Sequence, residues 1–241
     1  MSASNLSPMP TDWTRALAIV AHPDDLEYGC ASAVAAWTDA GREVVYVLAT
    51  RGEAGIDTME PAKAGALREQ EQRASAAVVG VTQVEFLDHQ DGVVEYGVAL
   101  RRDLAAAIRR HRPELLITMS HADTWGAKNW NQPDHRAVGR AAIDAVADAG
   151  NRWIFPGEGG EPWTGVRWVA VAGANEPTHA VDVSATLERG VRSLMEHRAY
   201  LEALGDEDAE TYSRNLVESI AGMAAERFGG RPAIAFDLYP R

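Results

Sequence analysis

The chain alternates short, almost continuous apolar runs with longer segments in which apolar residues recur every three or four positions. The short runs predict buried strands over 16–21, 43–49, 83–87, 114–119 and 167–172. The longer segments predict helices over 29–40, 61–79, 97–111 and 134–149, most of them closed by a glycine or a proline. Strands that alternate with helices in this way indicate an α/β fold on a mainly parallel sheet.

The C-terminal third has a less regular pattern. Residues 179–183 are a candidate extension of the fifth strand, helical patterns follow at about 184–204 and 207–227, and 233–238 predicts a last strand at the edge of the sheet. Gly205 and Asp206 separate the two helical patterns. The sequence has no internal repeat and no low-complexity linker, so we expect one domain over 1–241, with residues 1–12 as an extended N-terminal arm.

The order of the predicted strands gives a place for a binding site. Five successive strand–helix units with right-handed crossovers predict a Rossmann-like three-layer sandwich of strand order 3-2-1-4-5. Strands 1 and 4 are neighbours in that order, and the chain reverses direction between them. Ligands of such sheets bind at the carboxyl ends of the strands at this reversal. The loops after residues 21 and 119 are therefore the ones expected to carry the chemistry.

Composition and charge restrict the classes of function. The chain has 241 residues, 23 Lys plus Arg against 35 Asp plus Glu, and a formal net charge of −12. This acidic balance argues against nucleic acid or an anionic membrane surface as a partner. The 46% hydrophobic content excludes a disordered chain. No apolar run has the length of a membrane span, the first residues lack the pattern of a secretory signal, and one cysteine allows no internal disulfide, so we expect a cytoplasmic protein.

Imidazole and carboxylate side chains gather in the two nominated loops. The first loop reads His22-Pro23-Asp24-Asp25, and the segment after the fourth strand contains Pro133-Asp134-His135. A catalytic zinc takes three protein ligands from His, Asp and Glu and keeps one position open for water. His22, Asp25 and His135 can supply these three ligands. The positive end of the helix that begins near residue 134 favours the neutral imidazole that binds metal.

Asp24 then lies beside the metal without being needed as a ligand, and it is the natural general base for a zinc-bound water. Simpler interpretations exist for each segment taken alone. Asp24 and Asp25 could be helix-capping residues after a strand, and Pro133-Asp134 could be a helix start with His135 as a bystander. The strand order places both segments in one crevice, however, and this coincidence favours a metal site.

Five motifs together resemble the PIG-L/LmbE family. They are AHPDD, ATRGEAG, LREQEQRASAAVVGV, FLDHQDG and PDHRAVG, in this order within about residues 14–150. The resemblance implies a Rossmann-like sheet and zinc-dependent hydrolysis of an N-acyl amide, usually on an amino sugar. The family's zinc ligands map onto His22, Asp25 and His135, and its catalytic base maps onto Asp24.

Two further positions follow from the resemblance. Arg68 resembles a substrate-binding arginine, and Asp91 resembles a carboxylate that orients a histidine or substrate hydroxyls. The alternatives are a surface ion pair on a helix for Arg68 and an ordinary turn residue for Asp91.

One position departs from the family pattern. Several members have His-Pro-Asp-His, whose first histidine stabilises the oxyanion, whereas this chain has Gln132 there. An amide can donate a hydrogen bond to an oxyanion, but it cannot act as an imidazolium acid. Either Asp24 returns the proton to the leaving amine or another group does, and His121 is a candidate.

The leading hypothesis is therefore a zinc-dependent N-deacetylase with one Zn²⁺ per chain, although another divalent metal would suit the same ligands. We expect its partner to be a small N-acyl amino-sugar conjugate, and a homo-oligomer is compatible with the sequence. Two alternatives stay open at this point. One is an amidase that acts on a larger sugar–thiol or natural-product amide, and the other is a metal- or ligand-binding protein without catalysis. Trp125, Trp130, Trp153 and Trp163 either pack long loops or, in one or two cases, form a wall for a sugar.

Overall fold

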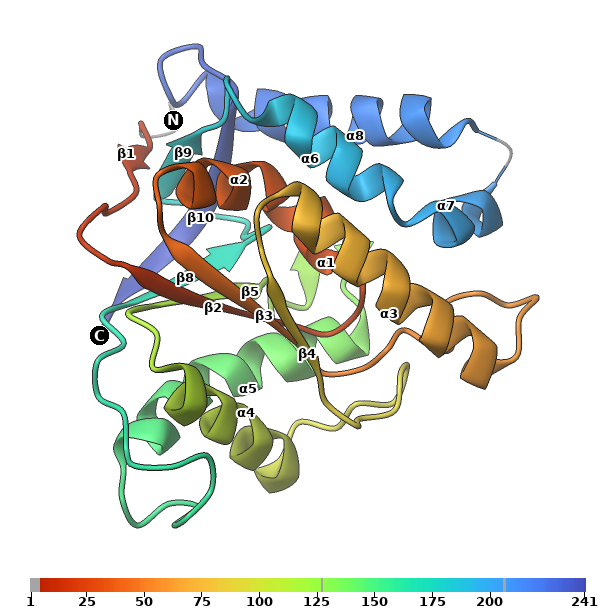
Figure 1. Cartoon of the computed structure of the whole chain (residues 1–241). Helices are drawn as coiled ribbons and strands as arrows, with labels where there is room; N and C mark the ends of the chain where they lie inside the picture. Colours follow the sequence, from red (N-terminus) through yellow and green to blue (C-terminus); the bar gives the residue numbers. More distant parts are fainter. Residues whose placement is uncertain (1–4, 127, 206) are drawn as a thin grey trace.

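The computed structural model describes residues 5–126, 128–205 and 207–241. It is a mixed α/β fold in which helices cover both faces of a large central sheet (Figure 1). Over the described residues the strands of this sheet follow the order β1-β9-β10-β8-β5-β2-β3-β4.

The parallel part of the sheet positions the candidate site. It consists of β2 (Arg15–Val20), β3 (Glu43–Leu48), β4 (Gln83–Phe86), β5 (Leu115–Met119) and β8 (Trp168–Ala172). The five strands predicted from the apolar runs thus lie side by side as β4-β3-β2-β5-β8, all parallel. Strand β2 has β3 on one side and β5 on the other, so the chain reverses direction there.

The C-terminal strand differs from the prediction. Strand β10 (Ala233–Pro240) pairs antiparallel with β8 on one side and with β9 (His179–Asp182) on the other, so the expectation of an edge strand over 233–238 was wrong. The segment at 179–183 does not extend β8 but forms a separate strand. Apolar residues at alternate positions of β10 are buried in the core, which an inner strand requires.

The N-terminal segment ends the sheet. Within the described part of the expected arm over 1–12, β1 (Ser7–Pro8) pairs in parallel with β9, and Leu6 and Met9 are buried. Residues 1–4 of that arm lie outside the described residues. The two-residue length of β1 and its proline are typical of edge strands, because proline cannot donate a ladder hydrogen bond.

Alternation along the inner strands explains why they read as continuous apolar runs. Ala18 and Val20 of β2 pack into the core on one face, whereas Leu17 and Ile19 pack into the core on the other. Successive side chains of a strand point to opposite faces, so a strand covered on both sides needs apolar residues at every position. Helices cover both faces and supply the other half of each core.

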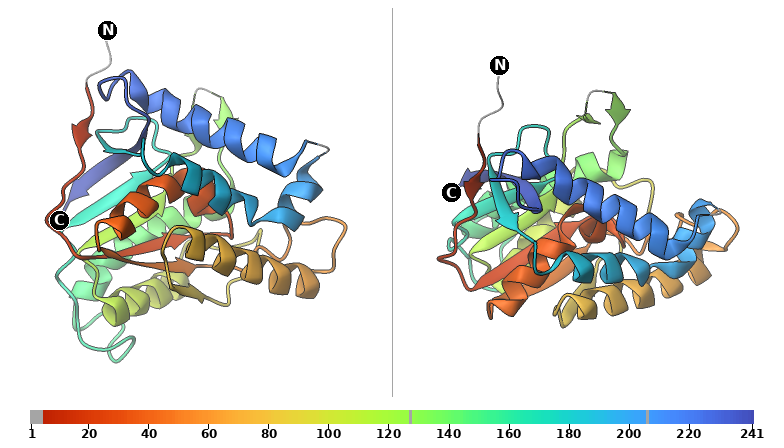
Figure 2. Two further views of the ribbon diagram at one scale, coloured as in Figure 1. Left: turned by 45° about the horizontal axis from the view of Figure 1, so that its top comes forward. Right: turned by 90° about the horizontal axis from the view of Figure 1, so that it is seen from above.

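The helices divide between the two faces, as Figures 1 and 2 show. One face carries α4 (Val98–His111) and α5 (Pro133–Gly150), which pack against each other and on β2. The other side carries the helices α1 (Asp25–Gly29), α2 (Ala31–Asp39), α3 (Pro61–Val78), α6 (Leu187–Met195), α7 (Arg198–Leu204) and α8 (Ala209–Ala225).

Two helices predicted as continuous are interrupted. The helix expected over 29–40 begins earlier, and Cys30 separates α1 from α2. The helix expected over 184–204 is two helices, α6 and α7, with His197 at the junction. His197 is fully buried, and its Nε2 lies 3.4 Å from Oε2 of Glu27 on α1. A long-range buried contact of this kind is invisible to a helical pattern. Asp206, expected between the last two helical segments, lies outside the described residues.

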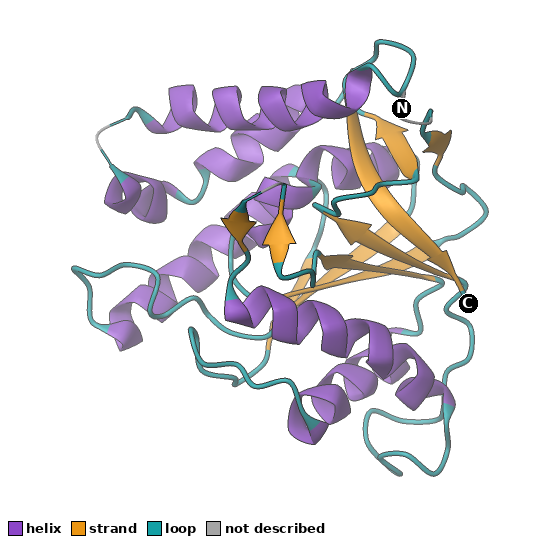
Figure 3. Ribbon diagram, turned by 180° about the vertical axis from the view of Figure 1, so that it is seen from behind, coloured by secondary structure: helices purple, strands orange, loops and turns teal. Residues whose placement is uncertain are grey.

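A small hairpin lies between β5 and α5. Strands β6 (Thr124–Trp125) and β7 (Asn129–Trp130) pair antiparallel, apart from the main sheet (Figure 3). Asn175 braces the hairpin, because its side chain accepts from the Gly126 amide and donates to the Thr124 carbonyl. Within the described residues no helix is both long and apolar enough to cross a membrane.

A buried arginine organises the loop that follows α5. Arg109 of α4 is 3% exposed, and its guanidinium donates hydrogen bonds to the backbone carbonyls of Asp148, Ala149, Asn151, Ile154, Phe155 and Glu158. Gly159 approaches α4 so closely that a Cβ there would lie 2.2 Å from the Ala106 carbonyl oxygen. Arg109 therefore satisfies the backbone carbonyls of this loop, and Gly159 allows the loop to pack closely against α4.

Replacing Arg109 by methionine should destabilise the fold, because six backbone carbonyls, two of them in buried hydrogen bonds, lose their donor while the volume is nearly kept. We expect the free energy of unfolding to fall by at least about 3 kcal/mol and the melting temperature to fall by roughly 6–12 °C. Urea denaturation followed by circular dichroism measures this. The matched control is Arg110→Met on the same helix, which removes only an exposed ion pair with Glu85 and should cost under about 1 kcal/mol. Equal losses in the two variants would contradict the role of Arg109.

Candidate metal centre and catalytic site

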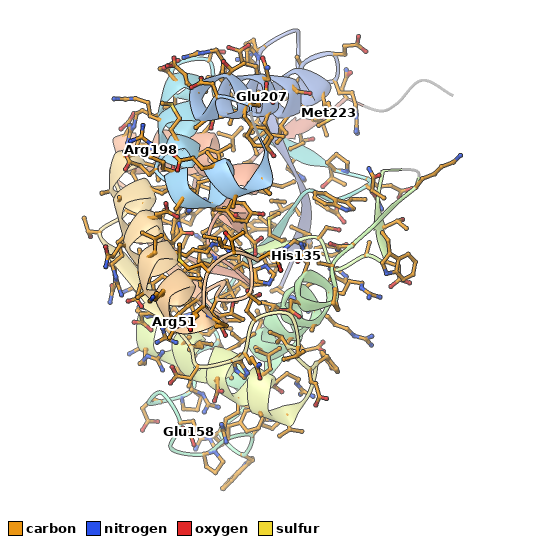
Figure 4. All side chains as sticks on the ribbon, turned by 90° about the vertical axis from the view of Figure 1, so that its right-hand side faces the viewer. Arg51, His135, Glu158, Arg198, Glu207 and Met223 are labelled. Atoms are coloured by element: carbon orange, nitrogen blue, oxygen red, sulfur yellow. The ribbon has the colours of Figure 1, made fainter. Side chains whose placement is uncertain are left out.

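The candidate site lies where the sheet reverses direction. His22, Asp24 and Asp25 follow β2, and His135 lies in the first turn of α5, which follows β5 and the hairpin. Figure 4 faces this side of the molecule, and His135 lies near its centre. The sheet order therefore brings together residues that are more than 100 positions apart in sequence.

The three predicted ligands form one cluster. Nε2 of His135 lies 2.9 Å from Oδ1 of Asp25, and Nδ1 of His22 lies 3.7 Å from the same oxygen. One ligand atom from each residue lies within 4.8 Å of the others. The second oxygen of Asp25 accepts hydrogen bonds from the amides of Ala21 and His22, which leaves Oδ1 facing the two imidazoles.

The other nitrogen of each imidazole has its own partner. Nε2 of His22 lies 3.1 Å from Asp91 and 3.2 Å from Asp134, and Nδ1 of His135 lies 3.1 Å from Oδ1 of Asn131. These acceptors assign the N–H to the outer nitrogen of each ring. Nδ1 of His22 and Nε2 of His135 then carry the lone pairs that can bind a cation. Second partners of this kind fix the tautomer of histidine ligands in metal sites.

Asp134 is a residue that the sequence analysis treated only as a helix start. Its carboxylate is 1% exposed and accepts from the amides of Gly92 and Val94, while Oδ2 also faces His22. Asp91, expected to orient a histidine or substrate hydroxyls, faces His22 and accepts from the Ala54 amide. Both carboxylates thus tie the loops after β3 and β4 to the cluster. The Pro-Asp-His sequence was the one signal for Asp134.

Asp24 adjoins the cluster in a constrained conformation. Its φ of 85° lies in the left-handed region, which aspartate tolerates better than most residues, and its amide donates to Oε1 of Gln72. Burial raises the pKa of the Asp24 carboxyl to about 6, although the nearby Arg68 guanidinium works in the opposite direction. A carboxyl group with a pKa near neutrality is well suited to accept and return a proton.

Asp25 has the opposite electrostatic character. Burial alone would raise its pKa, but the charge and hydrogen bond of His135, together with the contacts to His22, hold the pKa of Asp25 well below its usual range. Adjacent carboxyl groups with pKa values moved apart suit two roles, a permanent anion and a proton acceptor.

Arg68 lies behind Asp24. Its side chain is buried, donates to Oδ2 of Asp24 at 2.8 Å and also donates to the carbonyls of Pro23 and Gly52. The alternative of a surface ion pair is therefore wrong. The structure gives this guanidinium contacts with the protein's own groups, and it holds the carboxylate of Asp24 in place.

Gln132 and His121, the candidates for stabilising the oxyanion and for protonating the leaving amine, have different surroundings. Gln132 is exposed at the N-cap of α5, next to the turn that carries His135. His121 is half-buried and packs against α5 at Gly139. A Cβ added to Gly139 would lie 3.1 Å from the Cβ of His121. Burial lowers the pKa of His121, and the charges that act on it are those of Arg140, Asp144 and Asp237. None of these charged residues belongs to the cluster around Asp25.

The donor set fits a divalent metal ion. Two ligand atoms at about 2.0–2.2 Å from a tetrahedral ion are roughly 3.3–3.6 Å apart, and the observed separations of 2.9 and 3.7 Å bracket this range. Two imidazole nitrogens and one carboxylate oxygen leave a fourth position for water or substrate. The surrounding carboxylates of Asp91 and Asp134 add negative charge that a cation would balance.

Comparisons with known proteins show which family the chain resembles. The family model described as GlcNAc-PI de-N-acetylase (PIG-L) matches residues 17–146, just over half of the chain and all of the cluster. A diacetylchitobiose deacetylase from Thermococcus kodakarensis is 29% identical over 223 residues, which cover 90% of this chain and 81% of the relative. A probable N-acetyl-alpha-D-glucosaminyl L-malate deacetylase 2 from Bacillus anthracis is 28% identical over 138 residues, or 54% of this chain and 58% of the relative.

A solved structure is similar over nearly the whole chain. It is the N,N'-diacetylchitobiose deacetylase from Pyrococcus horikoshii complexed with its inhibitor MPG, with a TM-score of 0.85 and 25% sequence identity. The match covers 95% of this chain and 85% of that chain. The similarity therefore extends beyond residue 146 to the C-terminal helices and strands.

Removal of a ligand or of its partner should weaken metal binding to different degrees. His135→Ala deletes a donor atom, and we expect stoichiometric zinc binding to be lost. Asn131→Ala keeps all three donor atoms but deletes the acceptor that orients His135, together with two hydrogen bonds to the Ser120 and Ala122 carbonyls, so affinity should fall about 10–100-fold. Calorimetric titration of metal-free protein with zinc measures both. His89→Ala, whose imidazole pairs with Asp103, is the control and should bind zinc like the wild type. Full affinity in the His135 variant would contradict the site.

Proposed function

The chain belongs to the PIG-L family, and from this membership we propose that it is a zinc-dependent hydrolase that removes the N-acetyl group from an N-acetylglucosamine-containing substrate. Zinc is the usual metal in this family. The observation that carries the proposal is the cluster of His22, Asp25 and His135, together with the buried carboxyl group of Asp24, whose pKa responds to the charges of Asp25 and His22. A metal-binding protein without catalysis would not need this second, proton-accepting carboxyl group.

The first step of the proposed reaction depends on the metal site. His22, Asp25 and His135 would hold the zinc, which in such a site polarises a carbonyl and lowers the pKa of water toward neutrality. Asp25 supplies the fixed negative charge, while Asp91 and Asn131 keep the two imidazoles in the tautomers that bind metal. Because these partners are in place in the folded chain, little reorganisation is needed when the substrate binds.

Asp24 carries out the proton transfers in this proposal. Arg68 engages its Oδ2, so we assign to Oδ1 the acceptance of a proton from the attacking water. The same oxygen then returns the proton to the leaving amine when the carbon–nitrogen bond breaks. His121 is a weaker candidate for that donation, because its charged neighbours lie outside the cluster. The exposed amide of Gln132 can donate a hydrogen bond to the developing oxyanion.

The substrate class follows from the relatives. Those described above are named for deacetylation of diacetylchitobiose and of a GlcNAc–malate conjugate. We therefore propose a small saccharide or conjugate that contains N-acetylglucosamine. The hairpin bears two partly exposed indoles, Trp125 and Trp130, directly before the segment that holds His135. Indole faces suit the apolar face of a sugar ring, which is consistent with a substrate that extends past the reacting sugar.

The direct test of the proposed function is acetate release from N,N'-diacetylchitobiose. Asp24→Asn keeps the size of the side chain and one oxygen that can accept from Arg68 but removes the base, so turnover should fall at least about 100-fold. Zinc content should stay near one per chain, because Asp24 is not among the ligands. Wild-type activity in this variant would remove Asp24 from the mechanism. Absence of acetate from the wild type with saccharides and larger amides alike would overturn the proposed function.

A second prediction concerns the length of the substrate. Trp130 is 66% exposed, and the Arg136 guanidinium lies 5.0 Å from the centroid of its ring. If it supports a second sugar, Trp130→Ala should lower kcat/KM for diacetylchitobiose about tenfold, or about 1.4 kcal/mol, and leave that for N-acetylglucosamine unchanged. Trp153→Ala is the control, because this indole is 82% exposed on the loop organised by Arg109. Equal effects on both substrates would exclude a second-sugar contact.

A further inference from the structure

The inference begins with what holds Asp24. Three groups of the protein surround the Arg68 guanidinium along its polar edge, namely the Asp24 carboxylate, the Pro23 carbonyl and the Gly52 carbonyl. Asp24 has a left-handed backbone, so its side chain leaves the chain in an unusual direction. The position of the carboxylate therefore depends on the position of the guanidinium.

The loop after β3 approaches the guanidinium very closely. A Cβ on Gly52 would lie 2.2 Å from Nη1 of Arg68, and a Cβ on Gly55 would lie 2.3 Å from the same atom. Neither position can carry a side chain without moving the guanidinium, which accounts for both glycines of the Arg-Gly-Glu-Ala-Gly sequence. This side of Arg68 is thus closed by backbone.

An aromatic ring from a distant part of the chain also contacts this guanidinium. Tyr200 of α7 has its ring centroid 4.3 Å from Cζ of Arg68, which is a close cation–π contact. Its two neighbours fasten α7: the Ala199 amide donates to Oε1 of Glu71 at 2.6 Å, and Leu201 is 4% exposed among apolar residues of α6 and α8. Tyr200 is therefore held from both sides, and it lies far outside residues 17–146.

We propose that Tyr200 is a positioning residue for the reaction, because its ring holds the Arg68 guanidinium where it can fix the Asp24 carboxylate. This inference rests on the proposed function only in so far as Asp24 is the base. It assigns to α7 a role in catalysis without contact between Tyr200 and the reacting atoms. The ring carries this role, because the contact that reaches Arg68 is made by the aromatic face.

Three substitutions separate the ring from its hydroxyl and from general packing. Tyr200→Phe keeps the ring and should keep kcat within about twofold of the wild type. Tyr200→Leu removes the ring, and kcat should fall about ten- to a hundredfold with little change in KM, since misplacement of a catalytic group has this size of effect. Tyr212→Leu is the control: this tyrosine belongs to the same apolar cluster, but its hydroxyl contacts that of Tyr28. It should keep kcat at a comparable loss of stability.

The experiment measures kcat, KM, zinc content and melting temperature for the four proteins with diacetylchitobiose. The inference is overturned if Tyr200→Leu retains wild-type kcat, if Tyr200→Phe loses as much as Tyr200→Leu, or if the effect is confined to KM. Relaxation of the Arg68 Nε–H group by ¹⁵N NMR gives a readout that needs no turnover. We expect this group to become more mobile in Tyr200→Leu but not in Tyr200→Phe. Unchanged mobility would refute the inference even if the wild type released no acetate.

Discussion

The burial of carboxylates at one end of the sheet is the constraint on which the rest of the site depends. A buried charge is tolerated only when it is paired or hydrogen-bonded. Main-chain amides meet most of this need: Asp25 accepts from residues 21 and 22, Asp134 from residues 92 and 94, and Asp91 from residue 54. The amides that bind Asp91 and Asp134 belong to other loops of the chain, and those that bind Asp25 belong to the residues just before it. The loops after β2, β3 and β4 and the start of α5 are consequently fixed as one unit.

The parts of this unit that the sequence predicts are those that depend on local pattern and strand order. The strands covered on both faces are apolar at nearly every position, with only Glu43, Glu114 and Thr118 as exceptions, so their runs are conspicuous at 16–21, 43–49 and 114–119. Once these strands are ordered, the segments that contain His22 and His135 must meet at their carboxyl ends. The choice of His22, Asp25 and His135 as one cluster follows from this meeting and agrees with the geometry. Their role in binding zinc stays a prediction.

The features that the sequence could not reveal are pairings between distant segments. Nothing local marks β10 as an inner strand, because its neighbour β9 is formed by residues more than 50 positions earlier. Arg68 lies between the charged residues Lys63 and Glu69 in the sequence of α3, as a surface residue would. Only the packing of α3 on the loops after β2 and β3 shows that Arg68 is buried against Asp24. Asp134 has the sequence of an ordinary helix start, and its contact with His22 spans 112 positions. In each case tertiary contacts decide the role.

The way in which the cluster is held also explains how one metal arrangement could serve different substrates. Its carboxylates are fixed largely by main-chain donors, which keep their positions when neighbouring side chains change. The residues that border it, on the hairpin before α5 and on α7, make few of those hydrogen bonds. The side chains of the hairpin can vary without disturbing the ligand geometry, provided that the hairpin stays braced by Asn175. On α7, which is docked on Glu71, Tyr200 is the exception, because its ring contacts Arg68. Under the proposed function, substrate choice and metal binding would thus belong to different parts of one fold.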